Sequence, residues 1–243
     1  MKIGALMLAR SGSSFIDKNI KEVYGYPLMS FGMMAAKQVK LIDHFYLSSD
    51  SDLYLQMGEK YGYSPIKRPT SLSKVDSKSD DAVLHAVKNL KFLRRCDIII
   101  VQHANVITIY PKIISESISI LSKNNNFSSV VPAHVNSEYN PHRAYFRKKN
   151  SNEIKPAIKY NSSISPNRQD LPEAIFIDHS FWCIKTENIF KNHNFSPWNS
   201  LGNSIHPLLT NGMFDIHNEE DIKKSKEWLK NNKSKISYLN EFK

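Results

Sequence analysis

The chain has 243 residues, of which 41% are hydrophobic, and its 33 Lys and Arg exceed its 23 Asp and Glu, giving a formal charge of +10. This composition supplies enough apolar side chains for a full core. The apolar runs fall short of the roughly 20 residues that span a bilayer, and the N-terminus lacks the pattern of a secretory signal, so we expect no membrane partner.

The excess of basic residues and the two cysteines bear on the partners and the location of the protein. Basic chains favour polyanions, but the lysines here are scattered, and the densest stretch, residues 222–235, alternates with apolar residues at helical spacing. Without a recognisable module or a clustered basic stripe, we expect no nucleic-acid partner. Cys96 and Cys183 lie far apart without metal-site spacing, which indicates reduced, structural thiols and a cytoplasmic location.

Strand-like and helix-like patterns alternate along the first half of the chain. Strands are expected at residues 3–9, 44–49, 64–67, 97–102 and 127–133. Helices are expected at residues 27–41, 52–61, 80–90 and 110–123. This order predicts an α/β fold with a mostly parallel, twisted sheet and helices on both faces. Ligands of such sheets bind beyond the carboxyl ends of the strands, here at the loops after Met7, Ser49 and Gln102.

Residues 136–175 differ in character, being polar, basic and rich in Asn, Pro and Ser. The segment is too long for an ordinary connection in a compact domain. We interpret it as an extended dimerisation or lid insertion in an α/β domain formed by residues 1–135 and 176–243. The α/β pattern resumes after it, and residues 212–232 predict a strand, a turn and a terminal helix.

The loop after the first strand, "LARSGSSFIDKNI" at residues 8–20, carries Arg10 at the strand end and Lys18 eight residues later. It matches neither G-x-x-x-x-G-K-[ST] nor G-x-G-x-x-G. Arg binds phosphate oxygens with two parallel hydrogen bonds, and Lys acts as a point charge. The loop therefore predicts a site for a phosphate-bearing ligand, the alternative being an ordinary turn in which Arg10 caps the sheet.

Five segments, in order and over nearly the whole chain, resemble the acylneuraminate cytidylyltransferases, the CMP-sialic acid synthetases. They read "ARSGSSFIDKNI…GYPL", "YLSSDSDLYLQMGEKYG", "KRPTSLSKVDSKSDDAVLHAV", "RQDLPEAIFID" and "MFDIHNEEDIKKSKEWL". The resemblance implies a Rossmann-like nucleotidyltransferase fold and a homodimer. It also implies an enzyme that uses CTP and Mg²⁺ to activate a sialic-acid-like nonulosonic acid as its CMP-sugar, with release of pyrophosphate, for surface glycan biosynthesis.

The resemblance also implies roles for individual residues. The implied catalytic residues are Arg10, Lys18 and Asp215. The implied nucleotide-binding residues are Leu8, Ala9, Arg10, Ser13, Lys18, Asn19, Arg68, Asp76 and Ser77. The residues implied to meet the acidic acceptor are Gln102, Arg143, Arg168, Asp178 and His179, with both arginines on the dimerisation insertion. The implied metal ligands are Asp215 and His217.

The departures from the family pattern concentrate on the acceptor side. After Gln102 the family's P-T-S-P-L-R becomes "HANVIT", and its N-G becomes Asp178-His179. A carboxylate near an acidic sugar is repulsive unless its partner differs or a metal intervenes. His217 replaces a second aspartate, although Mg²⁺ prefers oxygen ligands. We therefore expect the CTP-binding residues of the family to be retained and its acceptor-binding residues to differ. The alternatives are another acidic sugar or a phosphonate as the acceptor, or a non-catalytic nucleotide-binding relative.

Overall fold

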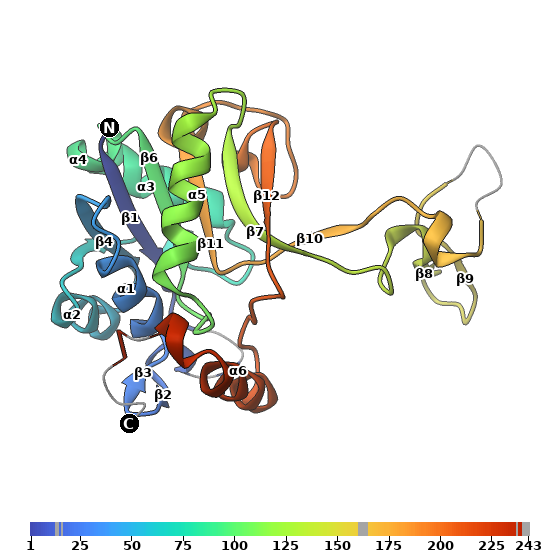
Figure 1. Ribbon diagram of the computed structural model, residues 1–243, viewed down its shortest axis with the longest axis horizontal. Helices are drawn as coiled ribbons and strands as arrows, with labels where there is room; N and C mark the ends of the chain where they lie inside the picture. The colour runs from blue at the N-terminus through green and yellow to red at the C-terminus, as the bar shows by residue number, and fades with distance from the viewer. Residues whose placement is uncertain (13–14, 16, 160–164, 237, 240–243) are drawn as a thin grey trace.

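The computed structural model describes residues 1–12, 15, 17–159, 165–236 and 238–239 (Figure 1). Its centre is an eight-stranded mixed sheet in the order β10-β7-β11-β6-β1-β4-β5, with β12 also paired to β7. The strands are β1 (Ile3–Leu8), β4 (His44–Ser49), β5 (Ser64–Lys67), β6 (Ile98–His103), β7 (Ser129–Val135), β10 (Ile175–Ile177), β11 (Phe181–Lys185) and β12 (Ile205–Leu209). No helix among the described residues has the length and apolar character needed to cross a bilayer.

The strands β5, β4, β1 and β6 run parallel to one another. All six residues of β1 are buried, because this strand lies inside the sheet and both of its faces are covered. Side chains alternate along it: Ile3 and Ala5 pack into one core cluster and Leu6 into another on the opposite face.

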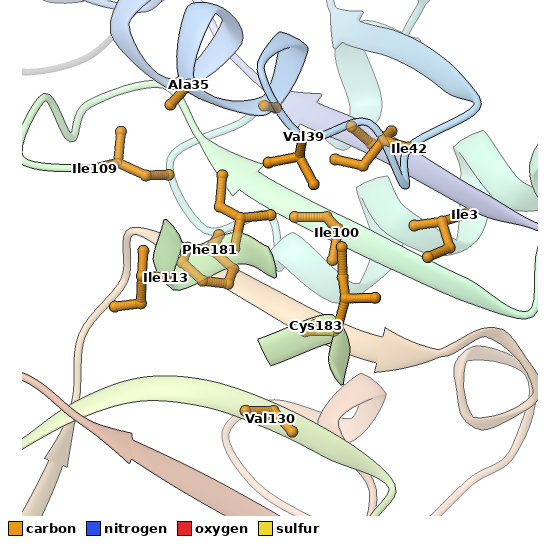
Figure 2. Close-up of a cluster of buried hydrophobic side chains, with 14 of the residues drawn as sticks. Ile3, Ala35, Val39, Ile42, Ile100, Ile109, Ile113, Val130, Phe181 and Cys183 are labelled. Carbon is orange, nitrogen blue, oxygen red and sulfur yellow. The ribbon is translucent and has the colours of Figure 1, made fainter. Parts of the chain in front are cut away.

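Helices cover both faces, as the alternation of elements predicted. The first cluster places α1 (Ser30–Lys37) and α5 (Pro111–Lys123) on one face, and Figure 2 shows Ile100 and Cys183 of neighbouring strands beneath Ala35 and Val39. The second cluster places α3 (Ser79–Asn89) and α4 (Lys91–Arg94) on the other face. A third cluster packs α2 (Asp52–Lys60) against β4 through Leu47. This is the Rossmann-like α/β architecture that the sequence predicted.

The second half of the sheet departs from the parallel pattern. Strand β11 runs antiparallel to both β6 and β7, and β10 antiparallel to β7, whereas β12 is parallel to β7. The strand predicted within residues 212–216 is wrong: only an isolated bridge joins Val106 to Asp215. Strand β12, which contains Pro207, was not predicted, because Pro is a poor strand former and signals a turn in a single sequence.

Two helix boundaries are set by local chemistry. Helix α1 begins at Ser30 rather than at Pro27, because Pro27 is taken up in the small hairpin β2 (Glu22–Val23) and β3 (Tyr26–Pro27). The C-terminal helix α6 (Glu219–Asn231) opens with a capping box in which Asn218 accepts from the Asp221 backbone and Asp221 accepts from the Asn218 backbone. This cap fixes the direction in which the chain leaves Asp215 and His217.

Residues 136–174, here called the arm, extend away from the sheet between β7 and β10 (Figure 1). The arm contains a short hairpin, β8 (Tyr145–Arg147) and β9 (Ile154–Pro156). Large apolar side chains on it face solvent, with Tyr139 75% and Phe146 61% exposed. At the base of the arm, β7 and β10 pair antiparallel with Phe176 opposite His134.

Candidate active site

A cleft of about 210 Å³ opens at the carboxyl ends of β1 and β6, where a parallel sheet offers its ligand site. Six of the residues predicted to bind a nucleotide line it: Leu8, Arg10, Lys18, Asn19, Arg68 and Ser77. Ala9 is buried beneath the cleft and Asp76 is exposed outside its wall. Ser13 lies outside the described residues.

Among the described residues, the charged side chains that line this cleft are all basic. The described lining contains four basic residues, Arg10, Lys18, Arg68 and Lys78, and no Asp or Glu. Arg10 donates to the carbonyl of Lys74 at 2.9 Å, which ties the first loop to the segment before α3. The cleft is therefore a positively charged concavity between two loops, a shape that suits a polyanionic ligand.

Three polar atoms of the cleft wall are buried without a partner among the described residues: Oδ1 of Asn19, Nε of Arg68 and Nε2 of His103. Asn19 is 4% exposed, and its amide donates to the carbonyl of Arg10 at 3.3 Å while Oδ1 remains unpaired. Arg68 is 5% exposed, and its Nε remains unpaired. Because buried polar groups are normally hydrogen-bonded, an acceptor and a donor left open in one wall indicate a ligand edge that supplies both.

Asp50, which the sequence analysis did not assign, organises this wall. Its carboxylate accepts from the Ser11 backbone at 2.9 Å and from the Ser11 hydroxyl, and it lies 3.9 Å from the Arg68 guanidinium. Burial favours a raised pKa for Asp50, but the Ser11 hydrogen bonds and Arg68 outweigh it and lower the pKa. The signal for Asp50 was its position at the end of β4, on the same sheet edge as the first loop.

Lys18 connects the first loop to the segment that carries Asp215. Its ammonium donates to the carbonyl of Ile216 at 3.0 Å. Burial lowers the pKa of Lys18 and Arg10 acts in the same direction, while Asp215 and Asp221 oppose the shift. The predicted catalytic residues Arg10, Lys18 and Asp215 thus interact electrostatically around one end of the cleft.

Asp215 and His217 differ in how well they suit Mg²⁺. The Oδ1 of Asp215 is buried without a partner among the described residues, and burial raises the pKa of this carboxyl against the opposing effects of His179, His217 and Lys18. Proteins bind Mg²⁺ through one or two carboxylates plus substrate phosphates, so Asp215 fits. The His217 side chain is 65% exposed, with Nε2 3.8 Å from Oδ2 of Asp215, and an imidazole suits softer metals. The described residues contain no group of three His, Cys, Asp or Glu that could hold a metal.

Gln102 does not reach the cleft. It is fully buried, donates to the carbonyl of Gly32 at 2.7 Å and accepts from the Tyr63 hydroxyl at 2.7 Å. Side chains alternate along a strand, so Gln102 faces α1 and the next residue, His103, lines the cleft instead. In this structure the residue at the end of β6 that meets the cleft is therefore His103, which the sequence analysis missed.

His103 and His179 lie in a cluster of aromatic rings. The His103 ring meets Trp182 edge-on at 4.7 Å, and the His179 ring meets Trp198 edge-on at 4.5 Å. Burial, with a smaller contribution from His179, lowers the pKa of His103 to about 3, so this imidazole is neutral at physiological pH. The cluster places the neutral imidazole of His103 in the wall of the cationic cleft, with the His179 ring beside it.

Asp178 precedes His179, and its carboxylate is buried and bonded to two protein side chains. Its side chain is 2% exposed, with one oxygen 2.7 Å from Nδ1 of His134 and the other accepting from the Thr210 hydroxyl at 2.9 Å. The carboxylate therefore joins β7 to the end of β12. This geometry favours a structural role for Asp178 over the acceptor contact implied by the resemblance, because the carboxylate is buried and both oxygens already bond to protein side chains.

Arg143 and Arg168 lie on the arm, which carries them away from the sheet (Figure 1). Both extend toward Glu138: Arg143 at 3.9 Å and Arg168 in direct contact. Their side chains are 46% and 55% exposed. The structure thus gathers the predicted nucleotide-binding residues but keeps these two predicted acceptor residues apart from them.

A family model described as cytidylyltransferase matches residues 5–241 of this chain. The chain is 28% identical over 190 residues to N-acylneuraminate cytidylyltransferase A of Danio rerio, a match that covers 77% of this chain and 42% of the relative. It is 26% identical over 201 residues to N-acylneuraminate cytidylyltransferase of Oncorhynchus mykiss, covering 81% of this chain and 44% of the relative. The chain therefore spans less than half the length of these relatives.

Solved structures share the fold at lower identity. The CMP:2-keto-3-deoxy-manno-octonic acid synthetase complexed with CTP aligns with a TM-score of 0.69 and 14% identity, covering 95% of this chain and 99% of that chain. The 4-diphosphocytidyl-2C-methyl-D-erythritol synthase of Anaerococcus prevotii aligns with a TM-score of 0.62 and 15% identity, covering 94% and 98%. These likenesses establish the fold.

Proposed function

The chain belongs to the cytidylyltransferase family, and on that premise we propose that it transfers CMP from CTP to a sialic-acid-like nonulosonic acid, releasing pyrophosphate, in the biosynthesis of a surface glycan. Relatives named for N-acylneuraminate support an acidic sugar as acceptor. The structural relative named for 2-keto-3-deoxy-manno-octonic acid supports the same class.

The cationic cleft carries this proposal. Among the described residues, four basic side chains and no carboxylate line it, which suits a triphosphate, and it lies at the sheet edge where α/β proteins bind nucleotides. The unpaired Oδ1 of Asn19 and Nε of Arg68 suit a base that offers both a donor and an acceptor. Cytosine does so through its amino group and its carbonyl oxygen.

The reaction joins two anions, so positioning and charge neutralisation supply most of the catalysis. The acceptor hydroxyl attacks the α-phosphorus of CTP, and the bond to the bridging oxygen breaks to release pyrophosphate. Arg10 and Lys18 bind the phosphate oxygens and offset their charge. Asp215 is the residue that fits Mg²⁺, which when bound would add positive charge at the phosphates.

The arm supports a homodimer in which it reaches a second copy of this chain. Its exposed tyrosine and phenylalanine side chains suit an apolar contact, and Arg143 and Arg168 would then meet the acceptor of the partner subunit. Mixing Arg168→Ala with Lys18→Ala chains tests this, because each heterodimer keeps one intact site. Random exchange would restore about a quarter of wild-type turnover, and a mixture as inactive as its components would exclude an arm that acts on the partner.

A cytoplasmic location is supported by the cysteines. Cys96 and Cys183 are both buried free thiols, and proteins exposed to oxidising compartments usually pair theirs.

A different acidic acceptor is the second candidate function, and the position of Gln102 favours it. The glutamine that the family resemblance places at the sugar is bonded within the core, and two imidazoles stand near the cleft. With imidazoles rather than a glutamine amide near the cleft, an acceptor whose uncharged groups differ from those of sialic acid would fit.

The test is pyrophosphate release from CTP with Mg²⁺, measured against N-acetylneuraminic acid, other nonulosonic acids, 2-keto-3-deoxy-octonic acid and a phosphonate. Release with a nonulosonic acid supports the proposal, and release with a different acid selects the second candidate. CTP binding without release from any acceptor would favour a non-catalytic relative. Failure to bind CTP would overturn the assignment altogether.

A further inference from the structure

A second and larger cavity, of about 650 Å³, opens at the opposite edge of the sheet. It is called here the amino-edge cavity. Its wall is formed by the end of α4 and the start of β6, by the end of α5, and by the end of β11 with the following 3₁₀ helix, Thr186–Phe190. Figure 1 shows α4 and the N-terminus at this end of the sheet and β2 and β3 at the other. The two sites are therefore separate.

The amino-edge cavity has two uncommitted arginines. Arg94 and Arg95 both line it, and neither guanidinium makes an ion pair or hydrogen bond among the described residues. The two carboxylates of the wall already face other cations, since Asp97 lies 4.0 Å from the N-terminal ammonium and Glu187 pairs with Lys191 at 3.1 Å. The uncompensated charge of the cavity is therefore positive, and guanidinium groups suit phosphate oxygens.

The rest of the wall offers a flat apolar surface and one buried hydroxyl that has no hydrogen-bond partner among the described residues. Phe190 is 43% exposed, with the Arg94 guanidinium 5.9 Å from its ring centre, and Ile98 and Leu121 form an apolar floor. Thr186 is 4% exposed, and its Oγ1 is buried without a partner among the described residues. An unpaired buried hydroxyl is costly, so a ligand group that bonds to it adds affinity.

We propose that the amino-edge cavity binds a nucleoside phosphate, with the phosphate on Arg94 and Arg95 and the base against Phe190. The hydroxyl of Thr186 bonds to a polar group of the same ligand. The volume of the cavity lies in the range of small-molecule sites. This site goes beyond the proposed function and does not depend on it, because the transfer reaction takes place at the opposite edge.

The test is a binding titration of the full chain with N-methylanthraniloyl-ADP, a fluorescent nucleoside diphosphate, in an Arg10→Ala/Lys18→Ala background. These two substitutions remove cations of the cleft at the carboxyl edge and leave the amino-edge cavity intact, so the remaining saturable binding reports a second site. Arg94→Ala/Arg95→Ala should weaken this binding at least about tenfold, as expected from losing charge-assisted hydrogen bonds. Lys88→Ala/Lys91→Ala removes the same charge from exposed residues nearby that do not line the cavity and should leave binding unchanged.

Thr186→Val separates binding from folding. It keeps the shape of the side chain and removes the unpaired hydroxyl, so thermal stability should hold or rise while the probe binds more weakly. Absence of saturable binding in the Arg10→Ala/Lys18→Ala background would overturn the proposal, as would equal affinity in the Arg94→Ala/Arg95→Ala and Lys88→Ala/Lys91→Ala proteins. Inorganic phosphate that binds as tightly as the probe would also contradict it, because the ring would then contribute nothing.

Discussion

The two halves of the sheet are built differently. Strands β5, β4, β1 and β6 are parallel and joined by local βα units, whereas β11, β7, β10 and β12 pair mostly antiparallel over long sequence separations. The parallel half carries the cationic cleft, and the other half carries the arm and the buried Asp178. The difference teaches that local βα units build the cleft to which we assign the nucleotide, while pairings between distant strands position the arm and the buried carboxylate.

The largest effect is expected in the parallel half. Lys18→Ala should lower turnover by about 10²–10³-fold, because the charge that faces the phosphates in the transition state is lost. Pyrophosphate release measures this, with circular dichroism to check the fold. Lys21→Ala is the matched control, since Lys21 lies three residues away and pairs with Glu219 at the surface. Equal activity in the two variants would remove Lys18 from the catalytic site.

The next effect is expected in the other half and concerns stability. Asp178→Ala should lower the free energy of unfolding by about 2–4 kcal/mol, because His134 and Thr210 lose a buried charged partner. Urea denaturation measures it, with the exposed Glu173→Ala as the control. An Asp178→Ala protein of normal stability that lost only acceptor affinity would restore the binding role implied by the family resemblance.

The contrast between the two halves of the sheet shows what the sequence could and could not predict. The strands and helices of the parallel half were predictable because each has its own pattern of apolar residues, and because each strand is followed in the sequence by the helix that packs on it. The structure places Gln102 in the core because it lies on the face of β6 that meets α1, and one residue of register exchanges the faces of a strand. Asp178 follows β10, and its partners His134 and Thr210 lie far from it in the sequence. His103 could have been found by alternation from Ile99 and Val101. Strand β12 could not, because its paired residues in β7, such as Ser129 opposite Ile205, lie 76 residues earlier, before the arm.

The dependence of stability on pH tests whether the imidazole of His103 is buried on its face of β6. The His103 pKa is about 3 in the folded chain, below its ordinary 6.5, so between these values the unfolded state binds more protons. Stability should therefore fall as the pH decreases from 6.5 toward 3, with a slope from this group approaching about 1.4 kcal/mol per pH unit. His103→Phe keeps a ring against Trp182 and should flatten the profile. An unchanged slope in urea denaturations between pH 6.5 and 4.5 would mean that His103 is not buried in neutral form.

The smallest effect on the free energy of unfolding is expected on the arm. It comes from comparing two carboxylates that each have two partners, one exposed and one buried. Glu138 meets Arg143 and Arg168, as Asp178 meets His134 and Thr210, but the Glu138 side chain is 63% exposed and that of Asp178 is 2% exposed. Water screens the exposed pairs and already solvates their partners. Glu138→Gln should therefore change the free energy of unfolding by less than about 1 kcal/mol. A loss as large as that of Asp178→Ala, measured by the same urea denaturation, would show that the arm is packed against protein in solution, and its dependence on protein concentration would identify that protein as a second copy of the chain.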